Sequence, residues 1–147
     1  MLDVAYEAVE DLPPGRLARV DEDRGLIRVR LDKRASLAEV VGQLNIEIDG
    51  LLRSARWFQL WGDEIVSCNT PGRPLRVEYL LEKREEYGTY VEERKGLVSV
   101  FIDPDLDTPA FAASMNPTAQ NLLDGGQWFQ LYAGEIIDNS PEPMSRV

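Results

Sequence analysis

The sequence contains no histidine in its 147 residues and a single cysteine, Cys68. Histidine is the commonest general base and metal ligand, so its absence excludes Ser–His and Cys–His catalysis. One cysteine excludes an intramolecular disulfide, and there is no glycine-rich phosphate-binding loop. Among enzymes, only those built on paired carboxylates or on a carboxylate-bound divalent metal remain. We therefore expect the chain to have no catalytic activity of its own.

Apolar runs of membrane-spanning length and a signal-peptide pattern are also missing. Together with the lone cysteine, this favours a cytoplasmic location. Basic residues are few, because 16 Lys and Arg stand against 26 Asp and Glu, for a net charge of −10. An acidic chain repels the phosphates of nucleic acids and membranes, so we expect neither as a partner. The charge either suits a basic protein partner or serves solubility alone.

What the sequence does contain is an internal repeat. The segment Trp57–Val66, WFQLWGDEIV, returns 71 positions later as Trp128–Ile137, WFQLYAGEII. Matches continue upstream at the same offset without a gap. Self-similarity at a fixed spacing is typical of a duplicated structural unit. We interpret residues 18–67 and 89–138 as a tandem duplication.

Each copy is predicted to form a strand, a second strand, a helix and a third strand. In the first copy, residues 26–31 alternate between apolar and polar side chains, which indicates a half-buried strand. The blocks that begin at Trp57 and Trp128 are rich in aromatic and β-branched residues, and each is predicted to be one long strand. Residues 75–81, between the copies, alternate in the same way and predict one more strand.

The two helices are predicted from their starts and their spacing. Ser36 and Glu39 have the spacing of a helix capping box, and Asp107 takes the place of Ser36 in the second copy. Apolar residues then follow at helical spacing. Pro117 is expected to break or kink the second helix, because proline removes a helical hydrogen bond.

These elements predict an α+β fold, in which a tandemly duplicated β-β-α-β unit forms a mostly antiparallel sheet with two helices packed on one face. Residues 1–147 are expected to form a single domain. Residues 68–88 join the repeats and contain the extra strand. Residues 3–12 are predicted to form a short amphipathic helix, and residues 139–147 a flexible tail.

The two copies differ in charge. Residues 18–67 carry nine acidic and eight basic residues, for −1, whereas residues 89–138 carry eight acidic and two basic residues, for −6. Phe101 in the second copy also takes the outward strand position that Arg30 holds in the first. We therefore expect the second copy to carry the binding surface.

A ridge of alternating aromatic and glutamine side chains recurs in both copies of the last strand. Exposed aromatic patches mark partner surfaces, and aromatic residues dominate the binding energy of interfaces. The alternative is that the ridge is buried by the N-terminal segment or by the opposite repeat. The candidate partner-binding residues are Trp57, Gln59, Trp61, Phe101, Trp128, Gln130 and Tyr132.

The preferred hypothesis is a small acidic binding module without catalysis, which holds another protein on an aromatic sheet face. The partner would be a basic toxin, blocked as immunity proteins block theirs, or a client held as acidic secretion chaperones hold theirs. This analogy rests on size, acidity and fold class. A homodimer in which the ridges bury each other is a further alternative.

A rival hypothesis is a divalent-metal-binding regulator or a carboxylate-based enzyme. Its site would be Asp103, Asp105 and Asp107, which alternate along the chain and carry the hard oxygen ligands that Ca²⁺ or Mg²⁺ prefers. The competing interpretation gives these carboxylates a structural role at the strand exit and the helix cap. No other cofactor is expected.

Overall fold

A computed structural model of the chain describes residues 2–54, 56–61, 64–67, 75–94, 96–125, 128–132 and 135–138. Cys68 and the predicted tail at 139–147 lie outside the described residues. The first half of the chain contributes β1 (Asp3–Val9), β2 (Ala18–Asp23), β3 (Leu26–Asp32), α1 (Leu37–Ser54), β4 (Arg56–Trp61) and β5 (Glu64–Ser67). The second half contributes β6 (Arg76–Leu81), β7 (Thr89–Arg94), β8 (Leu97–Ile102), α2 (Thr108–Gly125), β9 (Trp128–Tyr132) and β10 (Glu135–Asp138).

The described strands form three sheets rather than the predicted one. Two have three strands, in the orders β1-β3-β2 and β6-β8-β7, and the third has the order β10-β9-β4-β5. β1 runs parallel to β3, and β6 runs parallel to β8, whereas the other pairs are antiparallel. The α+β class with two helices and mostly antiparallel strands is confirmed. Tandem duplication stays a prediction, but the order of elements is the same in both halves.

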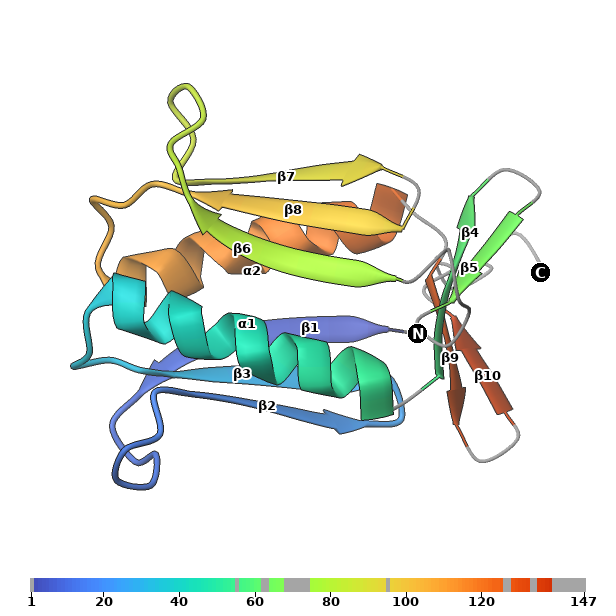
Figure 1. Ribbon diagram of the computed structural model, residues 1–147, viewed down its shortest axis with the longest axis horizontal. Helices are drawn as coiled ribbons and strands as arrows, with labels where there is room; N and C mark the ends of the chain where they lie inside the picture. The colour runs from blue at the N-terminus through green and yellow to red at the C-terminus, as the bar shows by residue number, and fades with distance from the viewer. Residues whose placement is uncertain are drawn as a thin grey trace, which may run out of the picture.

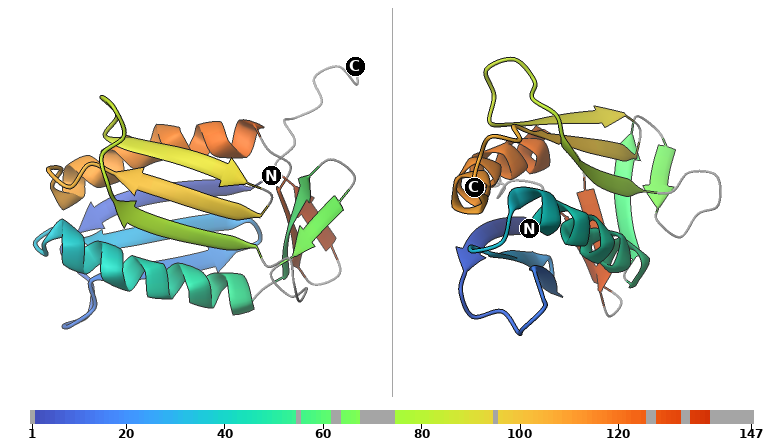
Figure 2. Two further views of the ribbon diagram at one scale, coloured as in Figure 1. Left: turned by 45° about the horizontal axis from the view of Figure 1, so that its top comes forward. Right: turned by 60° about the vertical axis from the view of Figure 1, so that its left-hand side comes forward.

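The two helices lie between the two three-stranded sheets (Figures 1 and 2). Helix α1 contacts β2 of its own half and β6 of the other, while α2 contacts β7 of its own half and β1 of the other. The predicted packing of both helices on one sheet face is therefore wrong, since each helix bridges the halves. The β10-β9-β4-β5 sheet lies across one end of this arrangement (Figure 1). No helix in the described part of the chain is long and apolar enough to cross a membrane.

The predicted helix starts are confirmed. The Glu39 amide donates to Ser36 Oγ at 3.3 Å, and the Ala110 amide donates to Asp107 Oδ1 at 2.8 Å. The predicted break at Pro117 is wrong, because α2 continues through it. Pro117 is on the exposed side of α2, where water can bond to the carbonyl left without its helical donor.

Two further predictions about strands are corrected. Residues predicted as an N-terminal helix form β1, because it pairs with β3 along its whole length. The blocks predicted as single long strands are each two strands of a hairpin, β4 with β5 and β9 with β10. The strand predicted between the repeats is confirmed as β6.

Asparagine side chains join the halves at the two sheet edges formed by β1 and β6. On β6, the Tyr79 amide donates to Asn45 Oδ1 at 2.7 Å, and Asn45 Nδ2 donates to the Tyr79 carbonyl at 3.0 Å. On β1, Tyr6 makes the same two bonds with Asn116, at 2.7 and 3.0 Å. Each helix therefore satisfies the backbone of an edge strand that belongs to the other half.

Candidate functional site

The described side chains of the predicted aromatic ridge are buried in the structure. Trp57, Gln59, Trp128 and Gln130 are at most 6% exposed, and the side chains of Trp61 and Tyr132 lie outside the described set. β4 pairs with β9 across the two halves, and the sheet they form closes one end of the core. The expectation of an exposed ridge is therefore wrong, and burial against the opposite repeat is what the structure shows.

The two glutamines of the ridge have different surroundings, although the repeat relates them. Gln59 Nε2 donates to Glu93 Oε2 of the other half. Gln130 is fully buried, and neither atom of its amide has a hydrogen-bond partner among the described residues. In the repeat, Gln130 corresponds to Gln59 and Glu22 corresponds to Glu93. The buried Oε2 of Glu22 also has no hydrogen-bond partner among the described residues. Among the described residues, Gln59 thus has a partner for its Nε2 but not for its Oε1, whereas neither amide atom of Gln130 has one.

Burial raises the pKa of Glu93 above its ordinary value, and the hydrogen bond from Gln59 opposes that shift. A carboxyl with a raised pKa stabilises the fold fully below its unfolded pKa, and this contribution is lost as pH rises through the folded pKa. Glu93 is thus a partly buried carboxyl group whose hydrogen bond comes from Gln59.

A matched pair of substitutions tests this difference. Gln130→Met removes a buried amide that has no hydrogen-bond partner among the described residues, and is expected to raise the free energy of unfolding by about 1 kcal/mol. Gln59→Met removes the partner of Glu93 and is expected to lower it by about 1–2 kcal/mol. Urea denaturation at neutral pH measures both, and equal losses in the two variants would contradict the assignment.

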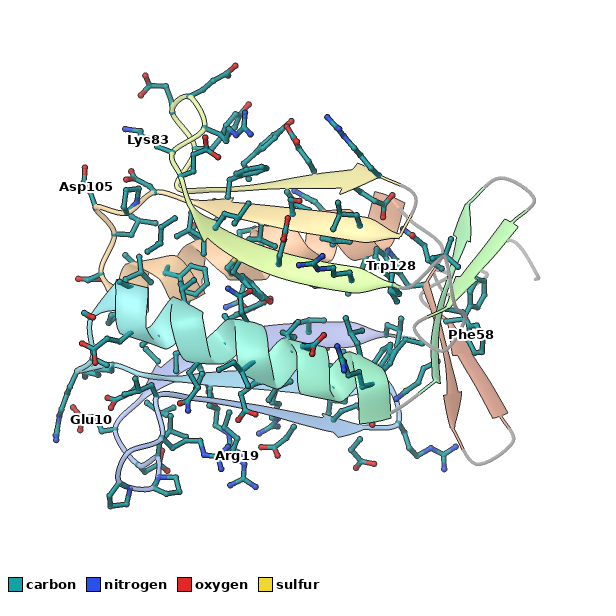
Figure 3. All side chains as sticks on the ribbon, viewed as in Figure 1. Glu10, Arg19, Phe58, Lys83, Asp105 and Trp128 are labelled. Atoms are coloured by element: carbon teal, nitrogen blue, oxygen red, sulfur yellow. The ribbon has the colours of Figure 1, made fainter. Side chains whose placement is uncertain are left out.

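The acidic residues proposed as a metal site have structural roles. Asp103 Oδ1 accepts from the Asp105 amide at 3.0 Å, Asp103 Oδ2 lies 3.8 Å from Lys83 Nζ, and Asp107 caps α2. Lys83 and Asp105 lie at the same end of the molecule (Figure 3). Within the described ranges, no three Asp, Glu, His or Cys side chains are grouped to hold a metal ion. Asp103 thus serves at the strand exit and Asp107 at the helix cap, and the Ca²⁺ or Mg²⁺ site at Asp103, Asp105 and Asp107 stays a prediction that the described residues do not support.

Phe101 occupies the outward position on β8 that its comparison with Arg30 predicted. It stands opposite Leu80 on β6 and Tyr90 on β7, which together make a cross-strand row that we call the aromatic row. Arg84 covers Phe101, with the guanidinium carbon 4.0 Å from the ring centroid. Tyr87 stacks on Tyr90, with ring centroids 5.4 Å apart. Tyr90 of the row is 37% exposed and Tyr87, which stacks on it, is 52% exposed, whereas Phe101 is only 6% exposed.

A second row lies beside the aromatic row on the same outer face of the β6-β8-β7 sheet. Ser99 stands opposite Glu78 and Glu92, and we call these three residues the acidic row. Ser99 Oγ donates to Glu78 Oε1 at 3.3 Å. A hollow of about 220 Å³ on this face is lined by Glu78, Leu80, Glu92, Arg94, Leu97, Ser99 and Phe101. Aromatic and carboxylate groups thus meet at one surface hollow.

The corresponding face of the first half has different chemistry. Arg30 takes the place of Phe101, and Arg19 takes the place of Tyr90. Both arginines pair with Asp21, at 2.9 and 3.2 Å. The aromatic row is therefore specific to the second half, which makes the first half an internal control.

Phe101, which the sequence analysis placed in the binding surface, faces outward but is 6% exposed beneath Arg84. Tyr87, Tyr90, Glu78 and Glu92 beside it were not predicted. The signal for Tyr90 was present, because the comparison that set Phe101 against Arg30 also sets Tyr90 against Arg19. Tyr87 is in the segment between β6 and β7, where only the folded chain shows the stacking. The chain matches no protein-family model, and comparisons with curated proteins and with solved structures give no match.

Proposed function

We propose that the chain is a small acidic, non-enzymatic module that binds a basic protein through the outer face of its β6-β8-β7 sheet. The observation that carries the proposal is the juxtaposition of the aromatic row, the acidic row and the hollow on one face. Tyrosines supply large contact area at low entropic cost, and aromatic residues dominate binding hot spots. Inhibition of a basic toxin and retention of a basic client are two forms of this function.

Contacts within the chain favour a basic partner. Arg84 stacks on Phe101, so the aromatic row already holds one guanidinium. Two carboxylates, Glu78 and Glu92, lie one row away, and the net charge of −10 favours the approach of a cationic surface. A partner arginine beside Tyr90 would therefore meet an aromatic face and a carboxylate together.

The test uses short arginine-rich, lysine-rich and glutamate-rich peptides in NMR titrations of the whole protein. Saturable shifts from the arginine-rich peptide are expected at Ser99, Phe101 and Tyr90, with weaker binding of the lysine-rich peptide and none of the acidic one. Tyr90→Ala is expected to weaken binding about tenfold, as for an interfacial aromatic hot spot. The affinity should fall as salt is added.

The matched control is Arg19→Ala, which changes the corresponding position of the first half. It is expected to leave peptide affinity unchanged or to raise it, because it removes a positive charge. Shifts spread over all acidic surfaces would show nonspecific attraction and would overturn the proposal. Light scattering that gives a dimer mass, lost in Tyr90→Ala, would assign the face to a second copy of the chain and also overturn it.

A further inference from the structure

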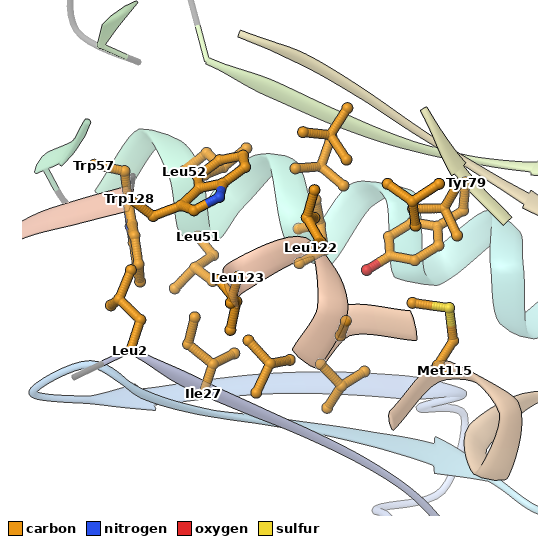
Figure 4. Close-up of a pocket in the computed structure, with 18 of the residues that line it drawn as sticks. Leu2, Ile27, Leu51, Leu52, Trp57, Tyr79, Met115, Leu122, Leu123 and Trp128 are labelled. Carbon is orange, nitrogen blue, oxygen red and sulfur yellow. The ribbon is translucent and has the colours of Figure 1, made fainter. Parts of the chain in front are cut away.

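An apolar cavity of about 110 Å³ lies at the centre of the molecule, between the two three-stranded sheets and the two helices. Nearly all of its lining residues fall into pairs that the repeat relates, such as Leu52 with Leu123 and Trp57 with Trp128. The cavity therefore lies where like residues of the two halves face each other. Figure 4 shows Trp57 and Trp128 at one end of it, and Met115 and Tyr79 toward the other.

One pair of lining residues is unequal in size. Ile48 on α1 and Ala119 on α2 hold the same position in the repeat, and both line the cavity. Both are buried. Alanine lacks most of the isoleucine side chain, so Ala119 leaves part of the cavity empty, whereas Ile48 fills the matching space in the first half. The wall opposite Ile48 is therefore incompletely packed.

A pair of tyrosine hydroxyls is the polar feature at one end of this cavity, and the indole N–H groups of Trp57 and Trp128 are at the other end. Tyr6 and Tyr79 both line it, both are buried, and their hydroxyl oxygens are 2.6 Å apart. Figure 4 shows the Tyr79 hydroxyl directed into the cavity. Only one proton can lie between two hydroxyl oxygens, so the pair retains one O–H donor. Among the described residues, neither hydroxyl has another hydrogen-bond partner.

We propose that this cavity binds a small, mostly apolar molecule whose single carbonyl or hydroxyl oxygen accepts a hydrogen bond from the Tyr6–Tyr79 pair. An apolar cavity of about 150 Å³ stays dry and binds benzene, so the space here suits a ligand of about five or six heavy atoms. Water is a poor occupant beside the tyrosines, because it needs two to four polar partners and that end of the cavity offers one hydroxyl pair. Among the described residues, this cavity and the hollow on the proposed protein-binding face share no lining residue, so the two sites are independent.

Cyclopentanone and cyclopentane are the matched probes, because they differ in the carbonyl oxygen. Titration is followed by NMR of the Met115 and Leu122 methyl groups, which line the cavity. Cyclopentanone is expected to give saturable shifts there, with about five- to tenfold tighter binding than cyclopentane, as one hydrogen bond supplies. Absence of saturable shifts at these methyls, or equal affinity for the two probes, overturns the proposal.

Four variants locate the ligand. Ala119→Ile introduces the residue found at the matching position of the other half, fills the space and should abolish binding of both probes. If that variant fails to fold, the smaller Ala119→Val is used, and it should weaken the binding of both probes. Ala113→Ile places the same side chain on the exposed face of α2 and should leave binding unchanged. The double variant Tyr6→Phe/Tyr79→Phe should bind both probes with equal affinity. Retained binding in Ala119→Ile, or a retained ketone preference in the double variant, overturns the assignment.

Discussion

Replacing both Asn45 and Asn116 with alanine is expected to lower the free energy of unfolding by about 3 kcal/mol. Each asparagine makes two hydrogen bonds to the backbone of one tyrosine in an edge strand of the other half. A hydrogen bond contributes about 1 kcal/mol net, and an unsatisfied buried backbone group costs more. Asn116 is the more exposed of the two, so water compensates part of its loss and Asn45→Ala has the larger single effect.

The control is Asn121→Ala, an exposed asparagine on α2 that should change the free energy of unfolding by less than about 0.5 kcal/mol. Equilibrium urea denaturation measures all four variants, including the double. Because the two sites are in different strands, their effects should be close to additive. If Asn45→Ala is no more destabilising than Asn121→Ala, the edge-strand hydrogen bonds do not hold the halves together.

The fold is expected to lose stability steeply above about pH 10. Burial raises the pKa of Tyr6 from 10.0 to about 12, and the hydrogen bond from Tyr79 opposes that shift. Burial also raises the pKa of Tyr79, and its charge interaction and hydrogen bond with Tyr6 add to the rise. The folded state therefore holds these protons more tightly than the unfolded state, in which tyrosine ionises near pH 10.

The direction of this pH dependence follows from proton linkage. The stabilisation is complete below pH 10 and is lost as pH rises from 10 through the folded pKa values. Tyr6 alone accounts for a loss of about 3 kcal/mol between pH 10 and 12, and Tyr79 adds to it. Denaturation curves recorded across this range, with tyrosinate absorbance as a second probe, measure the loss.

Phenylalanine variants separate this effect from general alkaline unfolding. Tyr6→Phe/Tyr79→Phe should remove most of the loss between pH 10 and 12, whereas Tyr90→Phe on the exposed face should leave it in place. At pH 7 each single variant should be less stable than the double, because one change leaves the other hydroxyl buried without a partner. An unchanged alkaline transition in the double variant would show that other groups control it.

Local patterns predicted most of the elements correctly. The cap residues Ser36 and Asp107 mark the starts of both helices because capping needs only the residue itself and the next turn. The strand β6 follows from its own alternation. β1 was missed because β1 and β6 are related at a different spacing from the rest of the repeat. Tyr6 pairs with Val29 and Tyr79 pairs with Val100, so the chain from β6 to β8 is two residues shorter than the chain from β1 to β3. A search at the constant offset of 71 does not align them.

The candidate site was predicted only in part. Phe101 was identified because its outward position depends on strand alternation, which is local. The predicted ridge was misplaced, because alternation shows which side chains share a face but not which face another element covers. Pairing of β4 with β9, between segments about 70 residues apart, buried Trp57 and Trp128. The tyrosine pair was missed for the same reason.

The sequence by itself determined the α+β class, the starts of the two long helices, and the presence of an internal repeat. These depend on periodicity, capping and self-similarity, which are carried by neighbouring residues or by the comparison of one half with the other. Tertiary structure decided that each helix packs on the opposite half, that the aromatic ridge is internal, and that Tyr6 meets Tyr79. These contacts join segments that no local pattern relates, since burial depends on which surfaces meet when both halves pack together.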